Sequence, residues 1–331
     1  MKNRFNKFLR AATGNWRTAV FAITSKCNCR CIMCDMHKQT PQAIGIEDAR
    51  RIIHFLAENH FLTVYFTGGE PTLHPDLIEM VRYANQLGLV TSLTTNGTSS
   101  VNLVRNLKDA GLNIISVSLD HWEPEICSKI RGHNGILEKQ ERVITACREM
   151  GLKVYALACL NEFLVNGDVT MMIDYVSQRL KVPFALCYPT TSKMNSFRLD
   201  SKLCNEFSAE SLKLTVAAFL RSKKDGVKIA NMGLYLEDAL KKPEEKPNFW
   251  CKGGETVVYV DWNGDVYPCF LKPRLFNILD GTTPAFLKNV KCNECMVNCF
   301  REPSIIPGIF LSPMLTWKEG IYSRNVIGMY I

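Results

Sequence analysis

The stretch CNCRCIMC at residues 27–34 follows directly on Thr18–Thr24, an apolar run rich in β-branched residues with the composition of a strand. Its Cys27, Cys31 and Cys34 have the spacing C-x3-C-x2-C. Thiolates this close together in one loop can surround one face of a cubane iron–sulfur cluster, because cysteine is the usual ligand of such clusters. The sequence therefore predicts a strand that ends in a loop of three thiol ligands.

The same loop permits two other interpretations. One is a zinc knuckle, in which Cys29 or His37 would be the fourth ligand, and the other is a chance run of cysteines. Three protein ligands around a cluster leave one iron open to an exogenous donor, as a catalytic metal keeps an open position. In that arrangement we interpret Cys29 as a bystander between ligands.

Outward from this loop, residues 18–190 alternate between short strand-like runs and amphipathic stretches with helical spacing of apolar residues. The predicted strands are Thr18–Thr24, Thr63–Thr67, Val90–Thr95, Ile114–Leu119, Lys153–Leu160 and Phe184–Tyr188. The predicted helices are Ile46–Asn59, Asp76–Leu87, Val101–Ala110, Gly135–Met150 and Val169–Leu180. Such short crossovers imply parallel strands. Six units predict an open, partial (β/α)6 TIM-like barrel with its chemistry at the C-terminal ends of the strands.

Composition limits the class of protein. The chain has 331 residues, of which 47% are hydrophobic, so it can form a full core and is not a disordered protein. No uncharged apolar run reaches the roughly 20 residues of a membrane span, and no secretory signal is evident. We therefore expect a cytoplasmic protein whose 14 cysteines are reduced. The net charge of +8 is too small to predict a nucleic-acid binder.

A second group of cysteines lies near the C-terminus. The candidates are Cys251, Cys269, Cys292, Cys295 and Cys299. Two short strand-like runs, Thr256–Asp261 and Asp265–Pro268, flank an Asn-Gly turn between the first two of these cysteines, which predicts a hairpin. Clustered cysteines in a reducing compartment are usually metal ligands, so we predict a small, cysteine-rich C-terminal domain.

The second predicted strand runs into Gly68-Gly69-Glu70-Pro71, where two glycines let the backbone approach a bound group closely. With C-x3-C-x2-C after the first strand and GGE after the second, the chain resembles the radical S-adenosylmethionine (radical SAM) superfamily. The resemblance covers roughly Ala19 to Arg301. It implies that Cys27, Cys31 and Cys34 hold a [4Fe–4S] cluster whose free iron is chelated by SAM.

The resemblance also implies SAM-binding residues. Gly68, Gly69 and Glu70 would hold the methionyl ammonium, Met33 would contact adenine, and Arg131 would pair with the SAM carboxylate. The other candidates for SAM binding are Asn96, Ser118, Asp120 and Tyr188, at the ends of predicted strands. Their alternative roles are ordinary ones: turn formation for Asn96, a solvated loop arginine for Arg131, a buried ring for Tyr188.

The C-terminal cysteines resemble the SPASM domain of radical SAM enzymes. Cys251 is followed by twelve residues, Gly264, four residues and Cys269. The remaining C-x2-C-x3-C is too short for two auxiliary clusters, which favours the "twitch" form with one auxiliary [4Fe–4S] cluster. We assign Cys251, Cys269, Cys292 and Cys295 as its first ligands, with Cys299 able to replace one. A structural zinc ribbon has nearly the same ligand spacing and is the alternative.

These expectations define the predicted organisation and activity. The domains are a basic N-terminal arm (1–17), a radical SAM partial barrel (18–240), a SPASM/twitch-like domain (249–302) and an apolar tail (303–331) that packs back on the barrel. The resemblance implies reductive cleavage of SAM to a 5′-deoxyadenosyl radical, which abstracts hydrogen or adds to an unsaturated carbon. An electron donor such as flavodoxin or ferredoxin is the expected partner.

The sequence narrows the substrate little, leaving a small molecule, a lipid or a peptide. The basic arm, with Lys2, Arg4, Lys7 and Arg10 among aromatic residues, permits a weak contact with an anionic membrane surface. A helix beneath the open barrel is the simpler interpretation of that arm. The alternative function is a noncatalytic iron–sulfur or zinc-binding protein that has lost SAM chemistry, against which the intact cysteine and GGE motifs argue.

Overall fold

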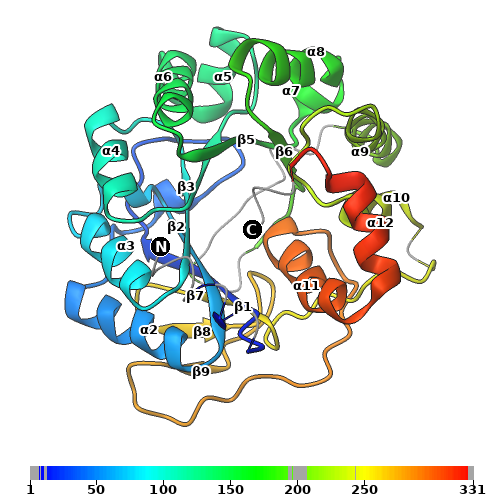
Figure 1. The fold of residues 1–331 in the computed structure, drawn as a ribbon. Helices are drawn as coiled ribbons and strands as arrows, with labels where there is room; N and C mark the ends of the chain where they lie inside the picture. Colours follow the sequence, from blue (N-terminus) through cyan, green and yellow to red (C-terminus); the bar gives the residue numbers. More distant parts are fainter. Residues whose placement is uncertain are drawn as a thin grey trace.

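The computed structural model describes residues 7, 9–10, 13–192, 196, 207–242 and 244–326. Six parallel strands follow one another along the sheet (Figure 1). They are β1 (Arg17–Thr24), β2 (Phe61–Gly68), β3 (Val90–Thr95), β4 (Ile114–Ser118), β5 (Lys153–Cys159) and β6 (Phe184–Cys187). The six predicted strands are all present, with small differences at their ends. Because β6 is an edge of the sheet, the barrel is open, which confirms the predicted partial TIM-like barrel.

Helices cover the outer face of these strands (Figure 1). They are α2 (Ile46–Glu58), α3 (Leu77–Gln86), α4 (Val101–Asp109), α5 (Pro124–Arg131), α6 (Ile136–Glu149), α7 (Glu162–Val165) and α8 (Val169–Asp174). Each long helix buries one apolar stripe, as α3 does with Leu77, Met80, Val81 and Ala84. The sequence did not predict α5, and the expected helix Val169–Leu180 continues beyond α8 as a π-helical segment, Tyr175–Leu180.

The predicted C-terminal hairpin does not stand apart from the barrel. Its strands β7 (Val257–Val260) and β8 (Asp265–Tyr267) are followed by β9 (Phe276–Asn277), and all three extend the sheet beyond β1. Strand β7 pairs with β1 in parallel, with Thr18 opposite Val257, and every residue of β7 is buried. The boundary expected near Phe249 therefore does not interrupt the sheet, because a strand this apolar is stable only when it is paired and covered.

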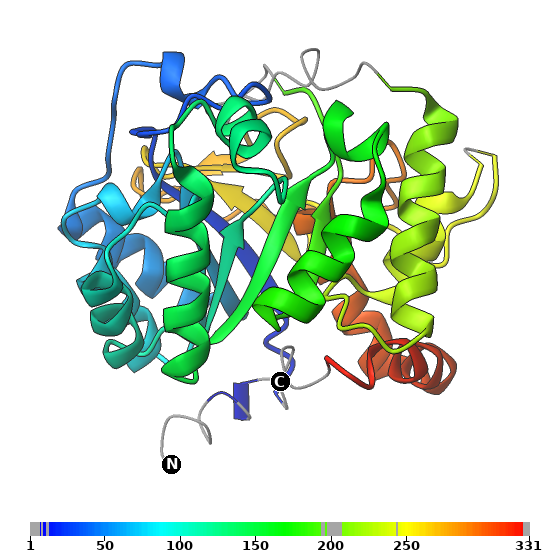
Figure 2. The same cartoon turned by 90° about the horizontal axis from the view of Figure 1, so that it is seen from above.

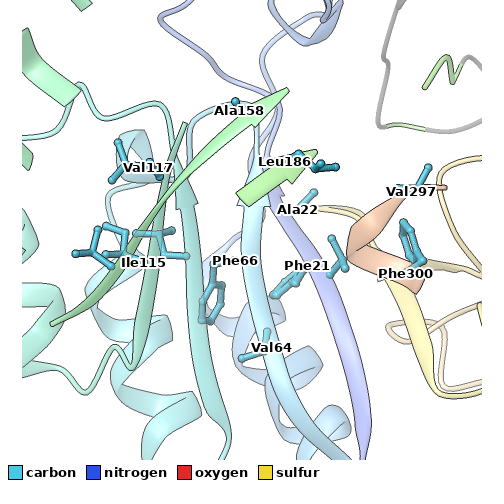
Figure 3. Close-up of a cluster of buried hydrophobic side chains, with 14 of the residues drawn as sticks. Phe21, Ala22, Val64, Phe66, Ile115, Val117, Ala158, Leu186, Val297 and Phe300 are labelled. Carbon is cyan, nitrogen blue, oxygen red and sulfur yellow. The ribbon is translucent and has the colours of Figure 1, made fainter. Parts of the chain in front are cut away.

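The C-terminal segment is helical and lies against the open side of the barrel. Here α11 (Asn298–Leu311) and α12 (Pro313–Ser323) lie near α9 (Ala209–Lys224) and α10 (Gly233–Leu240) (Figure 1). Val297 and Phe300, at the start of α11, are buried beside Phe21 of β1 (Figure 3). Packing against the barrel was predicted, but the helix was not, because Pro303 and Pro307 lie inside α11 and prolines disfavour helix interiors.

The described part of the basic arm binds the barrel. Lys7 Nζ donates to Asn85 Oδ1 (3.1 Å) and Asn113 Oδ1 (2.7 Å), and burial lowers the pKa of Lys7 to about 8. Arg10 Nη2 donates to the carbonyls of Ala57 and Phe61, both at 2.7 Å. These contacts agree with the simpler interpretation of the arm.

Some expectations concern residues outside the described ones, namely Lys2 and Arg4 of the arm. Among the described helices, none is long and apolar enough to cross a membrane. The loop after β1, with the 3-10 turn η1 (Met36–Lys38), lies at one end of the barrel, and α12 lies at the other (Figure 2).

Candidate functional site

A cavity of about 690 Å³ occupies the inside of the open barrel. Its wall includes residues from the loop after β1, from the ends of β2 to β6, and from α11 and α12. All three thiols of the C-x3-C-x2-C motif line it. The predicted SAM-binding residues that also line it are Met33, Gly68, Gly69, Glu70, Asn96, Ser118, Arg131 and Tyr188. The structure thus brings the predicted residues of the first site together, except for Asp120.

The three motif thiols have different electrostatic environments. Burial raises the pKa of Cys27 to about 11 and that of Cys34 to about 12. A hydrogen bond from Cys29, together with the charge of Arg131, lowers the pKa of Cys31 to about 7. Arg131 Nη1 lies 3.8 Å from Cys31 Sγ. Cys31 is therefore the thiol of the motif that most readily becomes a thiolate.

Cys29 also lines the cavity, but its thiol is held by the protein. The residue is 1% exposed, Asn96 Nδ2 donates to its sulfur at 3.2 Å, and its thiol is hydrogen-bonded to Cys31. Asn96 Nδ2 also donates to Asn28 Oδ1 at 2.8 Å. Asn96 therefore fixes the cysteine loop directly, a role that the sequence did not predict for it.

The neighbouring backbone leaves no room for a side chain at either glycine of the GGE segment. Gly68 has φ +138°, and a Cβ on it would lie 2.2 Å from the carbonyl oxygen of Thr24. A Cβ on Gly69 would lie 2.3 Å from the carbonyl oxygen of Lys26 and 2.5 Å from that of Ser25. We expected Gly69 to be small because SAM approaches it. The structure gives a further reason, because the segment leading into Cys27 occupies the space that a Cβ of Gly69 would need.

Glu70 is fully buried, and both of its carboxylate oxygens accept hydrogen bonds. Oε1 accepts from Thr72 N (3.0 Å), Thr72 Oγ1 (2.5 Å) and Thr95 Oγ1 (2.8 Å). Oε2 accepts from the backbone N–H of Asn96 at 2.6 Å. Burial raises the pKa of Glu70, while these hydrogen bonds oppose that shift. Glu70 therefore joins the end of β2 to the end of β3 beneath the cavity.

Asp120 and Arg131 form a buried ion pair. Arg131 Nε lies 2.5 Å from Asp120 Oδ2, although the two groups are not aligned as a hydrogen bond. Asp120 Oδ1 accepts from the backbone N–H of Cys159 at 2.8 Å. Asp120 is 0% exposed and does not line the cavity, so in this geometry it orients Arg131. Contact of Asp120 with SAM remains a prediction.

Two other predicted residues lie on the cavity wall. Met33 is buried and packs with Ile130 against Cys31 and Cys34, next to the cysteine loop. Tyr188 follows β6, and burial raises the pKa of its hydroxyl. Both line the cavity, and their contact with adenine stays a prediction.

The C-terminal cysteines also come together. Cys251 and Cys292 are joined by reciprocal backbone hydrogen bonds of 3.0 Å and 3.4 Å. The Cys269 thiol interacts electrostatically with the thiols of Cys251, Cys292 and Cys295. Burial raises the pKa of Cys269 to about 12. The loop that carries them is fixed by buried Arg301, whose Nη1 donates to Asn293 Oδ1 at 2.9 Å.

Cys299 lies both in the group of C-terminal cysteines and on the wall of the barrel cavity. It lies near Cys269 and Cys295, and it also lines the barrel cavity. Its place in the first turn of α11 explains this, because α11 runs from the C-terminal cysteine loop into the wall of the cavity. Burial raises the pKa of the Cys299 thiol.

Several cavity residues were not predicted from the sequence. Glu302 follows Cys299 by one helical turn, and burial raises its pKa to about 8 although Asn231 Nδ2 (3.1 Å) and Met232 N (2.9 Å) donate to it. Tyr65, Tyr155, Cys159 and Cys187 line the same cavity. For these four residues the sequence offers one weak signal, their positions on strands. Alternation along a strand predicts which residues share one face of the sheet, but it does not predict that this face lines a cavity.

Both thiol sets have the donor chemistry of an iron–sulfur site. In the described part of the chain, no three His, Cys, Asp or Glu side chains converge as the ligands of one metal ion do. In a four-iron cluster each thiolate binds a different iron, so the thiols stand further apart than the ligands of one zinc ion. The donor type thus suits a cluster at both thiol sets, and the identity of the metal that each set holds is a question for metal analysis.

Comparison with known proteins identifies related enzymes. Residues 21–172 match the Radical SAM superfamily. A probable GTP 3′,8-cyclase of Methanococcus aeolicus is 29% identical over 300 residues, which cover 84% of this chain and 92% of the relative. A PqqA peptide cyclase of Xanthomonas oryzae is 27% identical over 232 residues, covering 66% of this chain and 58% of the relative.

Solved structures share the fold. Streptococcus suis SuiB bound to S-adenosylmethionine superposes with a TM-score of 0.63 at 18% identity, over 81% of this chain and 64% of SuiB. The chain thus spans less than two thirds of SuiB. The protein anSMEcpe with bound AdoMet gives a TM-score of 0.61 at 21% identity, over 80% of this chain and 78% of that protein.

The motif thiols make a first prediction. Cys27→Ala, Cys31→Ala or Cys34→Ala should each abolish 5′-deoxyadenosine release and lower bound iron by about half, because two thiolates hold a four-iron cluster poorly. Cys29→Ala is the matched control from the same loop and should keep both near normal. Iron content and 5′-deoxyadenosine are measured after anaerobic reconstitution. An inactive Cys29→Ala beside an active Cys31→Ala would overturn this ligand set.

Gly69 makes a second prediction. Gly69→Ala should lower the amount of iron held by the N-terminal thiols, and it should lower the free energy of unfolding by about 1–3 kcal/mol. Both effects are expected because the Cβ of the alanine would collide with the backbone of Ser25 and Lys26. Gly45→Ala is the control, since a Cβ there meets nothing within 4 Å. Urea unfolding and iron analysis measure the two effects. Full iron content with weakened SAM binding alone would show that SAM, and not the backbone, requires the glycine.

Proposed function

We propose that Cys27, Cys31 and Cys34 of this chain hold the SAM-binding [4Fe–4S] cluster of a radical SAM enzyme, the superfamily whose model matches residues 21–172. The observation that carries this proposal is the single cavity that the three thiols share with the GGE segment. When bound, the cluster supplies the electron that cleaves SAM reductively to methionine and a 5′-deoxyadenosyl radical.

The chain's own residues prepare the site for SAM. Glu70 and Asn96 hold the cysteine loop against the ends of β2 and β3. Gly68 and Gly69 leave room for that loop, and the methionyl ammonium of SAM would bind beside them. Arg131, oriented by its ion pair with Asp120, presents a guanidinium for the SAM carboxylate. Met33 and Tyr188 would contact adenine.

The cavity favours a largely apolar substrate. Among the described residues that line it, Arg131 is the only basic one, and Asp120 already neutralises it. A nucleoside triphosphate needs several cationic partners, so a GTP-like substrate fits this lining poorly. The wall contributed by α11 includes the apolar side chains of Pro303, Ile306 and Ile309, and the carboxyl groups of Glu302 and Glu319 add no positive charge to it. We therefore propose a small molecule, a lipid or a peptide side chain as substrate, attacked by hydrogen abstraction or radical addition.

We propose a second [4Fe–4S] cluster of the twitch type in the C-terminal region. Its first ligands are Cys251, Cys269, Cys292 and Cys295, and Cys299 is able to replace one of them. Because Cys299 reaches the barrel cavity, this site lies beside the substrate space. Four available thiols leave no need for substrate as a ligand, which favours electron transfer. The enzyme also needs a reductant, and flavodoxin or ferredoxin in the cytoplasm would supply it.

Iron content tests the two-cluster proposal. The reconstituted protein should bind about eight irons per chain, the sum of two four-iron clusters. A triple Cys27/Cys31/Cys34→Ala variant should keep about half of that iron. If metal analysis finds zinc in place of the remaining iron, the C-terminal cysteines form a structural zinc ribbon and the proposal of a second cluster is wrong.

Cys269 tests the division of labour between the two sites. The Cys269→Ala variant should still release 5′-deoxyadenosine slowly, because Cys269 does not line the barrel cavity. Conversion of substrate by the same variant should be largely lost. Cys147→Ala is the control, since this buried cysteine of α6 belongs to neither thiol set and does not line the cavity. Loss of 5′-deoxyadenosine release in soluble, folded Cys269→Ala would make the C-terminal region part of the primary site.

A further inference from the structure

Two cysteines outside both motifs face each other on the wall of the cavity. Cys159 ends β5 and Cys187 ends β6, and the two residues are opposite one another in the parallel pairing of these strands. Residues in register on neighbouring strands point to the same face of a sheet. The two thiols are accordingly hydrogen-bonded to each other, and both line the cavity.

This pair lies next to the proposed SAM site. The backbone N–H of Cys159 donates to Asp120, whose other oxygen pairs with Arg131, and Arg131 reaches Cys31 Sγ at 3.8 Å. The Cys159 side chain also packs against Met33 and its neighbour Ile130, the same small cluster that contacts the cysteine loop. The two thiols therefore border the space in which a radical would form.

Ordinary core packing does not account for the pair. Cysteines that act as small hydrophobes are buried among apolar side chains, as Cys127 and Cys147 are here at 0% exposure. Cys159 and Cys187 instead keep part of their surface in the cavity. The hydrogen bond with Cys187, together with burial, raises the pKa of Cys159, so this thiol keeps its S–H bond near neutral pH.

We propose that Cys159 and Cys187 form a dithiol that donates a hydrogen atom to a carbon-centred radical in this cavity. The proposal rests on the proposed function, which supplies the radical. An S–H bond is weaker than the C–H bond of an alkyl group, so transfer of hydrogen from a thiol to an alkyl radical is downhill. The chemical class of the acceptor is thus an alkyl radical, either on the substrate or on 5′-deoxyadenosine.

The step balances with a one-electron acceptor. The Cys159 thiol gives its hydrogen atom to the radical, which forms a C–H bond and leaves a thiyl radical on sulfur. The Cys187 thiol loses a proton to solvent and bonds to the thiyl sulfur. The resulting disulfide radical anion gives its extra electron to an oxidised iron–sulfur cluster and becomes a disulfide. An external dithiol then reduces this disulfide for the next cycle.

Deuterium labelling tests the donor role without knowledge of the substrate. The reconstituted enzyme is incubated in D2O with SAM and dithionite, and the label is measured by mass spectrometry as a fraction of the 5′-deoxyadenosine formed. Thiols exchange with solvent but aliphatic C–H groups do not, so a thiol donor places one deuterium in the product. We expect a labelled product from the unmodified enzyme and a several-fold lower labelled fraction in Cys159→Ala and in Cys187→Ala.

Cys147→Ala is the matched control and should leave the labelled fraction unchanged. An equal labelled fraction in the unmodified enzyme and in both cavity variants would overturn the donor role. A complete absence of 5′-deoxyadenosine from the unmodified enzyme would instead overturn the proposed function, so the two failures are distinguishable.

Disulfide mapping tests the pair independently of SAM cleavage. In-register neighbours on adjacent strands lie roughly 4.8 Å apart, within the range that a disulfide can bridge. Treatment of the reconstituted protein with diamide, followed by alkylation and peptide mass spectrometry, should give a peptide cross-linked between Cys159 and Cys187. Recovery of both cysteines in alkylated form after this treatment would show that they do not act as a pair.

Discussion

The site depends on the buried contact between the GGE segment and the loop that carries the first cysteines. Gly69 N donates to the Thr24 carbonyl at 2.7 Å and Glu70 N to the Lys26 carbonyl at 2.8 Å, so two backbone bonds dock the start of the loop on the end of β2. Glu70 Oε2 then accepts a hydrogen bond from the backbone N–H of Asn96, the residue that follows β3. A buried carboxylate is costly unless every oxygen is satisfied, and here both oxygens are. The position of the thiols is thus a property of strand ends and not of the loop alone.

Much of this arrangement could be predicted from the sequence, because it follows from local pattern. Alternating strand and helix signals place the ends of parallel strands at one edge of the sheet, and the cysteine and GGE motifs lie at two such ends. Strands β3 (Val90–Thr95) and β4 (Ile114–Ser118) were predicted with almost their observed bounds, since both are short runs rich in β-branched residues between predicted helices. The sequence therefore predicted which residues lie close together, and that they lie at the C-terminal ends of the parallel strands.

The features that escaped prediction depend on contacts between distant parts of the chain. Pairing of β7 with β1 joins residues about 240 positions apart, and no local signal encodes it. Helix α11 was hidden by Pro303 and Pro307, whose cost is offset by burial of Phe300 against the barrel. Asp120 was predicted to contact SAM because it ends a strand. Its engagement with Arg131 and with the backbone of Cys159 appears only in three dimensions.

Helix α11 connects the C-terminal cysteines with the wall of the barrel cavity. An open six-stranded sheet would expose its cavity to water, and a reactive radical intermediate requires that water and stray hydrogen donors be excluded. On this side α11, whose first turn carries Cys299, forms part of the cavity wall, so an element that lines the cavity also extends from the C-terminal cysteines. Cys159 on β5 and Cys187 on the edge strand β6 lie on the same cavity wall. Hydrogen donation and electron removal would thus both occur at the boundary between barrel and C-terminal region, close to where a substrate radical would be left after the first abstraction.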